Sequence, residues 1–263
     1  MNTAHGGLPC SYTAEQRMNL EEGSFSALSV YRQQSRPDLL KFVQVKRGVI
    51  MRLILLAAPG AGKGTQAEKL SAHFGIPTIS TGAILRKNIK EETELGKLAK
   101  KYIDDGKLIP DDVMIEVMKS RLAEDDCRSG FILDGFPRTI TQAEELAKSD
   151  IEIDCVLNID VPDDVIISRL SGRLECSKCA ATFHKEFRKP KTEGVCDNCG
   201  GALVTRADDK PETVKSRLET YHTQTEPLLA FYKEKGMLRT AVGQDSIDDT
   251  TREVLTVLGE EVK

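Results

Sequence analysis

Residues 52–65 read Arg-Leu-Ile-Leu-Leu-Ala-Ala-Pro-Gly-Ala-Gly-Lys-Gly-Thr, and apolar residues follow at helical spacing at Ala67, Leu70 and Phe74. A strand, a glycine-rich loop and a helix in this order bind phosphate, because glycines let backbone N–H groups converge and the helix N-terminus adds positive potential. Lys63 supplies a cation for the terminal phosphates, and the Thr65 hydroxyl can face Mg²⁺ or its waters. The stretch therefore predicts a phosphate-binding loop.

This loop departs from the pattern G-x-x-x-x-G-K-[ST] at two positions. Ala57 replaces the first glycine, and Gly64 separates Lys63 from Thr65. A Cβ at a tight turn can strain the loop or crowd the phosphates, so we expect Ala57 to reduce ATP affinity without abolishing it. A glycine turn without any ligand is the competing interpretation, and the placement of Lys63 disfavours it.

The composition leaves the function to local sites. The 263 residues can bury a sizeable core, and a formal net charge of −4 gives no global attraction to nucleic acid or to an anionic membrane. The longest apolar stretch near the start, residues 49–59, is too short to span a bilayer and contains Arg52. We therefore expect a cytoplasmic protein that uses neither nucleic acid nor a membrane as a partner.

From Met51 onward, short apolar runs alternate with helical patterns. Strands are predicted at 52–57, 77–80, 130–134, 153–159 and 237–242, with helices between them. This alternation indicates an α/β fold with a parallel sheet that is covered on both faces. Residues 182–206 interrupt the rhythm and contain too few apolar residues for a core of their own.

A second set of polar residues follows the strand predicted at 130–134. Asp134 and Arg138 come at its carboxyl end, where ligands bind in open α/β sheets. Asp134 can hold Mg²⁺ through water, and the Arg138 guanidinium can grip a phosphate. Gln142, one turn beyond Arg138, carries the amide donor and acceptor that reading an adenine edge requires.

Four of the seven cysteines form two C-x-x-C pairs, Cys176 with Cys179 and Cys196 with Cys199. Sixteen residues separate the pairs, a spacing that is typical of a tetrahedral zinc site with no open position for chemistry. Iron and disulfides are the alternatives; a reducing cytosol disfavours disulfides. The sequence therefore predicts a structural metal that holds residues 182–206 together.

Together these motifs resemble the adenylate kinase family in its long bacterial form with a zinc-binding lid, over residues 51–263. The resemblance implies a P-loop nucleotide kinase fold, a five-stranded parallel sheet with helices on both faces plus AMP-binding and zinc-lid insertions. The core domain would comprise 51–79, 110–172 and 211–263, the AMP-binding subdomain 80–109, and the lid 173–210. The implied activity is reversible phosphoryl transfer from ATP to AMP, giving two ADP.

Residue by residue, the resemblance implies three overlapping sets. ATP would contact Gly60, Ala61, Gly62, Lys63, Gly64, Thr65, Arg173, Thr182, Phe183 and Asp245. AMP would contact Thr81, Arg86, Lys107, Leu108, Ile109, Gly135, Phe136, Pro137, Arg138, Gln142, Arg206 and Arg217. The catalytic cations would be Lys63, Arg138, Arg173, Arg206 and Arg217, while Asp208 and Asp209 would hinge or brace the lid. The stretch 139–142 favours AMP over UMP or CMP, and Ala83 stands where many members of the family carry Asp.

The implied partners are ATP, AMP and ADP, with Mg²⁺ bound to ATP, structural Zn²⁺ in the lid and a monomeric chain. An AMP phosphate oxygen is already ionised, so catalysis would consist of positioning and charge stabilisation in a space closed to water. Two other interpretations stay open: an ATP-binding homologue whose catalysis is impaired by Ala57, and a zinc-ribbon protein that binds nucleic acid.

Residues 1–50 show no sustained helical or strand period and are predicted to be a disordered extension. One hypothesis makes Met51 the natural start, because Lys46, Arg47 and Gly48 can be encoded by a purine-rich stretch of the kind that binds a bacterial ribosome. A real flexible extension is the alternative. The first residue of protein from the native source decides between them.

Overall fold

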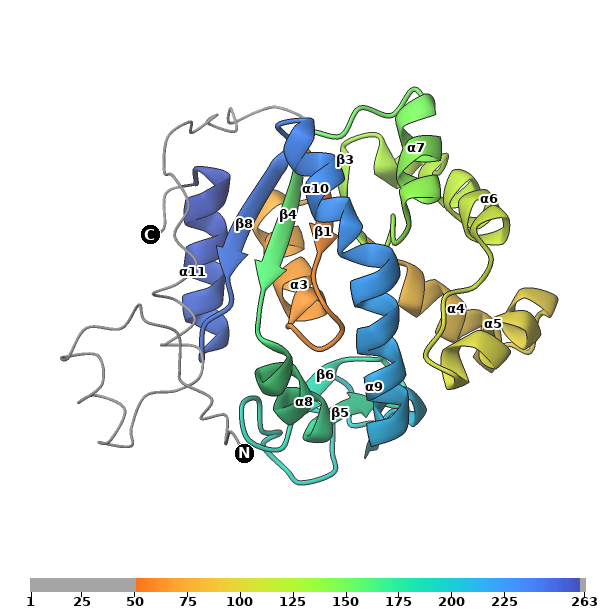
Figure 1. Cartoon of the computed structure of the whole chain (residues 1–263). Coiled ribbons are helices and arrows are strands. Elements are labelled where there is room, and N and C mark those ends of the chain that lie inside the picture. Colours follow the sequence, from red (N-terminus) through yellow and green to blue (C-terminus); the bar gives the residue numbers. More distant parts are fainter. Residues whose placement is uncertain (1–50, 261–263) are drawn as a thin grey trace, which may run out of the picture.

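The structure is a computed structural model that describes residues 51–260 (Figure 1). The predictions made for residues 1–50, including the hypothesis that Met51 is the natural start, lie outside the described residues.

The main sheet has five parallel strands in the order β2-β3-β1-β4-β8. These strands are β1 (Met51–Leu56), β2 (Thr78–Ser80), β3 (Gly130–Asp134), β4 (Cys155–Asp160) and β8 (Leu238–Val242). The predicted five-stranded parallel sheet is confirmed. The β4 strand begins at Cys155 rather than at residue 153.

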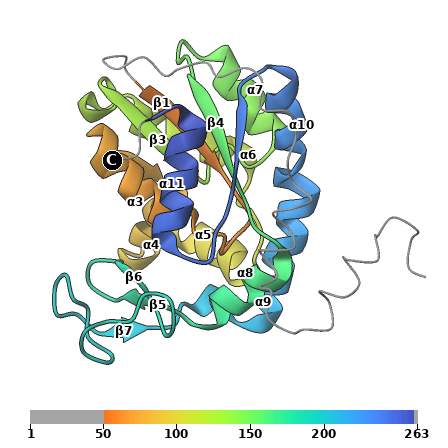
Figure 2. The same ribbon diagram turned by 90° about the vertical axis from the view of Figure 1, so that its left-hand side faces the viewer.

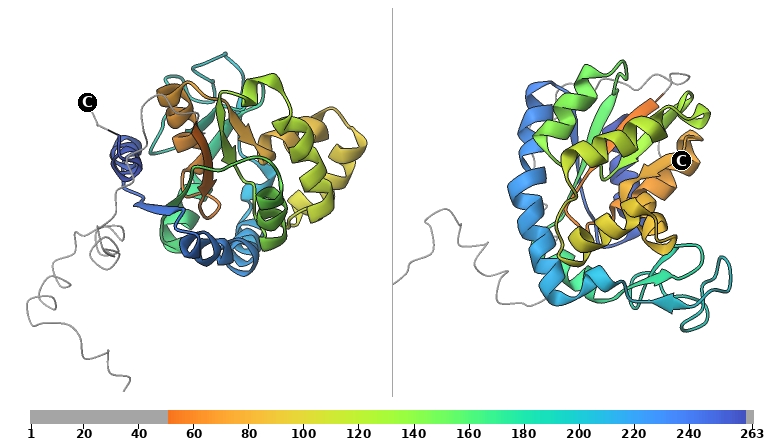
Figure 3. Two further views of the ribbon diagram at one scale, coloured as in Figure 1. Left: turned by 90° about the horizontal axis from the view of Figure 1, so that it is seen from above. Right: turned by 90° about the vertical axis from the view of Figure 1, so that its right-hand side faces the viewer.

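Helices cover both faces of this sheet (Figure 3). Successive residues of β1 point to opposite faces, so Leu53 and Leu55 enter one core cluster while Ile54 and Leu56 enter the other. The first cluster is completed by α3 (Lys63–Phe74), α8 (Asp163–Ser171), α9 (Pro211–Thr220) and α11 (Ile247–Leu258). The second is completed by α6 (Asp111–Leu122), α7 (Ile140–Lys148) and α10 (Pro227–Glu234).

A pair of helices stands between β2 and α6, at the right of Figure 1: α4 (Thr81–Lys90) and α5 (Glu94–Asp104). Thr93 caps α5 by accepting a hydrogen bond from the Gly96 backbone N–H at 3.0 Å. The two helices pack closely at Gly96, where a Cβ would lie 2.1 Å from the Asn88 carbonyl oxygen. This pair carries several of the residues predicted for AMP.

A small antiparallel sheet stands between α8 and α9, below the main sheet in Figure 2. Its strands are β5 (Arg173–Cys176), β6 (Thr182–His184) and β7 (Leu203–Val204), in the order β6-β5-β7. Its fully buried cluster contains only Cys176, Phe183 and Cys196. We call residues 173–210 the lid; that it is a separate moving unit remains a prediction.

Short turns of helix connect the rest: the 3₁₀ helices Asp125–Cys127 and Ala207–Asp209, and the π-helix Tyr221–Thr225 between α9 and α10. Within residues 51–260, every helix is too short or too polar to cross a membrane.

Candidate functional site

A cleft of about 330 Å³ opens at the carboxyl ends of β1 and β3, where parallel α/β sheets bind ligands. Residues assigned to ATP from the sequence all line it: Gly60, Ala61, Gly62, Lys63, Gly64, Thr65, Arg173, Thr182, Phe183 and Asp245. Those assigned to AMP also line it, with one exception: Thr81, Arg86, Lys107, Leu108, Ile109, Gly135, Pro137, Arg138, Gln142, Arg206 and Arg217.

The exception is Phe136. Its side chain is buried in the core cluster under α6, α7 and α10, and the residue is absent from the lining of the cleft. The sequence placed it in the site because it lies between Gly135 and Pro137, which do line the cleft. Its contact with AMP stays a prediction.

The glycine loop carries β1 directly into α3. Gly60 and Gly62 both have φ of +94°, which only glycine adopts readily. No side chain caps the N-terminus of α3, so its first backbone N–H groups face the cleft without competition from the helix's own residues. A Cβ on Gly62 or Gly64 would meet no atom within 4 Å, whereas one on Gly60 would lie 2.6 Å from Leu170. The loop is therefore a concave set of amides over open space.

Ala57 does not have the strained backbone that the sequence predicted. Among residues 51–260 the non-glycine residues with positive φ are Glu92 and Ala180, so Ala57 has an ordinary conformation. It borders the cleft but is only 5% exposed and belongs to the core cluster on the α3 face. The expected strain was wrong because the main chain turns at Gly60 and Gly62 rather than at Ala57.

Lys63, the first residue of α3, points to the end of β3. Its Nζ lies 3.6 Å from Asp134 Oδ1, and its side chain is only 17% exposed. Burial lowers the pKa of Lys63, the Asp134 carboxylate opposes that shift, and Arg138 and Arg217 add to it. Lys63 therefore lies within the electrostatic reach of arginines from two other parts of the chain.

The turn after β3 is built by hydrogen bonds to Gly135. The Thr81 hydroxyl donates to the Gly135 carbonyl at 3.0 Å, and Arg138 Nε donates to the same oxygen at 2.9 Å. Gly135 has φ of +85°, and a Cβ there would lie 2.6 Å from Thr81 Oγ1. This turn brings the Arg138 guanidinium to the cleft, and burial lowers the pKa of Arg138.

Gln142 is 2% exposed and its amide is already engaged. Its Oε1 accepts from the Arg138 backbone N–H at 2.8 Å, and its Nε2 donates to Asp111 Oδ1 at 2.7 Å. An amide oxygen has two lone pairs and an amide nitrogen two protons, so one acceptor and one donor position remain for a ligand. Asp111 also accepts from the Thr139 hydroxyl at 3.0 Å.

The arginines of the cleft are held by acidic residues of the lid. Arg173 Nε donates to Asp209 Oδ2 at 2.7 Å, and Arg217 lies 2.9 Å from Asp208 Oδ2 and 3.2 Å from Asp209 Oδ1. Asp209 has no exposed side-chain surface. The braces predicted at Asp208 and Asp209 are thus in contact with two of the predicted catalytic cations.

Burial is the main influence on the charges of these groups. Burial lowers the pKa of Arg86, and the positive charge of nearby Arg206 lowers it further. Burial also lowers the pKa of Arg217 to about 10. Burial alone would raise the pKa of Asp208. The positive charges of Arg217, Arg173 and Arg206, in decreasing order of effect, together outweigh burial and lower that pKa. Asp208 is therefore kept ionised beside buried cations.

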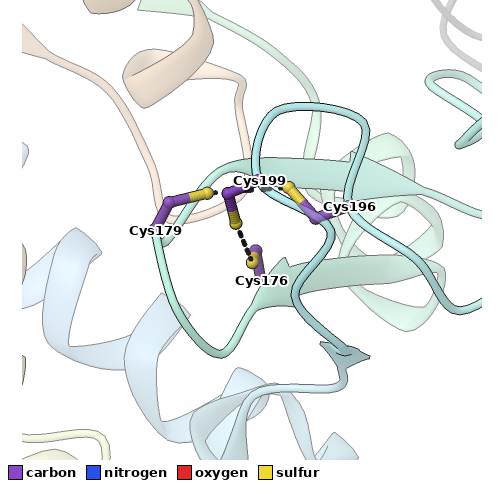
Figure 4. A group of neighbouring side chains, drawn as sticks. All are labelled: Cys176, Cys179, Cys196 and Cys199. Atoms are coloured by element: carbon purple, nitrogen blue, oxygen red, sulfur yellow. Dashed lines mark hydrogen bonds between the residues drawn. The ribbon is translucent and has the colours of Figure 1, made fainter.

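The four cysteines meet at one end of the lid (Figure 4). Their Sγ atoms all lie within 4.8 Å of one another, with Cys176 3.4 Å from Cys199 and Cys179 3.6 Å from Cys196. A disulfide needs about 2.05 Å between sulfurs, so these are free thiols. A tetrahedral zinc with bonds of about 2.3 Å places its sulfurs about 3.8 Å apart. The cluster fits such an ion.

His184 is not part of this cluster. Its Nε2 donates to the Arg169 carbonyl at 3.0 Å, while its Nδ1 accepts from the backbone N–H groups of Glu186 at 2.9 Å and Phe187 at 3.1 Å. Both ring nitrogens are therefore satisfied by the main chain. Burial lowers the pKa of His184, which keeps the ring neutral.

Several cleft residues were not assigned to the site from the sequence. Arg169 lines the cleft, donates to the Gln244 carbonyl at 2.7 Å and has its pKa lowered by burial. Its spacing of four from Arg173 was the available signal, although such pairs usually form a solvated helix face. Tyr221 and Thr225 reach the cleft from the π-helix, and Thr225 donates to the Arg138 carbonyl at 2.9 Å. The sequence contains no pattern from which this π-helix could be predicted.

A glycine loop on a parallel α/β sheet, facing arginines from two insertions, places the chain in the class of P-loop nucleotide kinases. The model of the family described as "Adenylate kinase" matches residues 55–237. The chain belongs to the adenylate kinase family, which confirms the resemblance noted in the sequence.

Relatives in bacteria and an archaeon match nearly all of their own length. The adenylate kinase of Caldicellulosiruptor saccharolyticus is 63% identical over 215 residues, which cover 80% of this chain and 100% of that protein. That of Caldicellulosiruptor bescii is 62% identical over 213 residues, covering 80% and 99%. The adenylate kinase of Methanosarcina barkeri is 53% identical over 212 residues, covering 79% and 98%. These relationships favour the kinase interpretation over an impaired homologue or a zinc ribbon that binds nucleic acid.

Proposed function

We propose that this protein transfers the terminal phosphoryl group of ATP to AMP, reversibly, in the cleft between the glycine loop and the lid. The observation that carries the proposal is the convergence on one cleft of Lys63 from α3, Arg173 from β5, Arg217 from α9, and Arg138 from the turn after β3. A phosphoryl group in transfer spreads negative charge over its oxygens, and cations fixed around it stabilise that charge.

ATP would lie against the glycine loop. The amides of residues 60–65 face open space beside Lys63, and the buried ammonium group would reach the terminal phosphates. Thr182 and Phe183 would meet the base or the ribose from the lid, and Arg169 and Asp245 border the same end of the cleft. Arg173 would contact the phosphates once Asp209 has oriented its guanidinium.

AMP would lie between α4 and the turn after β3. Arg86 and Arg138 would hold its phosphate, because a guanidinium presents several donors in one plane. The free donor and acceptor positions of Gln142 would read the adenine edge. Arg206 and Arg217 would reach the phosphates from the lid side, where both line the cleft.

No general base is needed in this reaction. A phosphate oxygen of AMP is ionised at neutral pH, so the protein has to align it with the γ-phosphorus and keep water out. The lid lies across the cleft from α4 and α5, and these are the parts we propose to open for exchange of nucleotides. Opening after transfer would then limit turnover.

Two metals fit the residues present. Asp134, beside Lys63, and the Thr65 hydroxyl would hold the Mg²⁺ of bound ATP through its waters, and that ion would neutralise phosphate charge. Four thiols at tetrahedral spacing would hold Zn²⁺ as a structural ion. Four unbridged thiols with the spacing of a metal site also support a cytoplasmic location. A monomer is proposed from the family resemblance alone.

A coupled assay of ADP formation tests the function. With ATP and Mg²⁺, we expect AMP to be phosphorylated far faster than UMP or CMP, and Gln142→Leu to weaken that preference. Glu144→Leu, an exposed position on the same helix, is the matched control. An equal rate with all three monophosphates would contradict the AMP assignment, and an absence of ADP with AMP would contradict the activity.

A further inference from the structure

Glu175 places a carboxylate among the cations of the proposed AMP site. In β5, Leu174 and Cys176 pack into the buried cluster of the lid, so Arg173 and Glu175 project from the opposite face of that strand. Thr182 and His184, which are paired with Glu175 and Arg173 in β6, line the cleft. Glu175 is thus an acidic side chain on the same face of β5 as the cation Arg173.

Two guanidiniums contact this carboxylate. Arg206 forms an ion pair with Glu175 Oε2, and Arg86 Nε lies 3.9 Å from Glu175 Oε1. The Glu175 side chain is only 14% exposed, so water screens these contacts weakly. Arg86 comes from α4 and Arg206 follows β7, so one acidic residue joins the acceptor side of the cleft to the lid.

Some donors and acceptors of Arg206 and Glu175 have no hydrogen-bond partner among residues 51–260. Within the described chain, the buried Arg206 Nε and Glu175 Oε2 have no hydrogen-bond partner, so the ion pair lacks the geometry of a forked hydrogen bond. Arg86 and Arg206 both line the cleft, whereas Glu175 does not. The two guanidiniums can therefore present donors to a ligand on one side while Glu175 contacts them on the other.

We propose that Glu175 is a positioning residue that acts as an internal counterion: it competes with the acceptor phosphate for Arg86 and Arg206 and so sets a weak affinity for AMP. This inference rests on the proposed function, because it assumes that the phosphate of AMP binds these two arginines.

The sign of the effect follows from charge. A phosphate that binds Arg86 and Arg206 must either displace the carboxylate or bind next to it, and both cost binding free energy. Arg173 and Asp208 also act on Arg86, with opposite charges. Removing the charge of Glu175 leaves the cluster with one more uncompensated cation and strengthens binding of an anion. ATP should be less affected, since Lys63 and the glycine amides are not in contact with Glu175.

Glu175→Gln separates this role from a merely structural one. Glutamine has the shape of glutamate and can still accept a hydrogen bond from an arginine, but it carries no charge. We expect the KM for AMP and the calorimetric Kd of AMP to fall by about three- to tenfold, with the KM for ATP changed less than about twofold. Glu175→Asp keeps the charge and should return the KM for AMP towards the wild-type value.

Glu193→Gln is the matched control, because Glu193 is an exposed glutamate of the same lid, and it should leave both KM values unchanged. Arg86→Lys is made in parallel to test the acceptor site itself and should raise the KM for AMP. If Arg86→Lys raises that KM but Glu175→Gln leaves it unchanged or raises it, the counterion role is overturned while the proposed function stands. If Arg86→Lys has no effect, the acceptor site and this inference fall together.

Discussion

The glycine loop and the lid border the same cleft from opposite sides, but different interactions hold each of them in place. The loop consists of backbone amides between a buried strand and a helix, with glycines at the positions where φ is positive and a single lysine. The lid has a buried apolar cluster of only three residues, four thiols, and arginines that are each paired with an acid. The loop is therefore held by the main core, whereas the lid has few apolar contacts and relies on polar contacts and on the proposed zinc, which fits the proposal that it moves.

Lys63 gives the largest expected effect and tests the loop side. Lys63→Met removes the cation nearest to the glycine amides, and we expect kcat/KM to fall on the order of 10²- to 10³-fold, because a preorganised charge in the transition state is lost. Steady-state ADP formation measures it. Lys69→Met, on an exposed turn of the same helix, should keep full activity. A fall of less than about tenfold would mean that the arginines carry the charge stabilisation without Lys63.

Loss of the lid metal ranks second. We expect one zinc per chain in fresh protein, and its removal by a chelator or by Cys179→Ser should leave the main sheet folded while the lid loses its structure. Activity should fall about 10- to 100-fold, and limited proteolysis should cut first within residues 173–210. Cys155→Ala, a change in the main core away from the cluster, should keep the metal. Full activity in protein free of metal would contradict the dependence of the lid on its ion.

His184 should make the lid sensitive to acid. Burial lowers its pKa from 6.5, so the unfolded chain binds a proton more readily than the folded one. Its contribution to stability is therefore complete above pH 6.5 and is lost as the pH falls from 6.5 to the lower folded pKa. A proton on Nδ1 would also face the N–H groups of Glu186 and Phe187.

The measurement is amide hydrogen exchange in β5 and β6 as a function of pH. Relative to His184→Gln, the wild-type lid should lose protection on acidification. His222, on the surface, is the opposite case, because Glu226 and Asp163 raise its pKa. Its contribution to the free energy of unfolding is therefore complete below pH 6.5 and is lost as the pH rises through the higher pKa of the folded state. A lid whose protection is the same on both sides of pH 6.5 would show that His184 does not titrate with folding.

The difference between the two regions also explains what the sequence could predict. Local patterns predicted the strands, the glycine loop with Lys63, and the cluster of four cysteines, since periodicity, glycine content and C-x-x-C spacing are properties of a short stretch. Arg169 and Glu175 enter the site through tertiary contacts, and the pairing of Glu175 with Arg86 joins residues that lie far apart in the chain. Phe136 illustrates the same limit: it lies next to cleft residues in the sequence, but its side chain points into the core.

Substitution of Ala57 gives the smallest expected effect. It tests whether the loop tolerates a methyl group at position 57, as its ordinary backbone conformation indicates. The φ of Ala57 is not positive and the residue lies in the core, so Ala57→Gly should leave the KM for ATP within about twofold while lowering the free energy of unfolding by about 1 kcal/mol, because glycine gains freedom in the unfolded chain. Gly62→Ala adds the same methyl group at φ of +94° and should raise the KM for ATP instead. A lower KM for ATP in Ala57→Gly would mean that the methyl group crowds the phosphates after all. The cost of a side chain in this loop would then depend on its distance from the ligand rather than on backbone conformation.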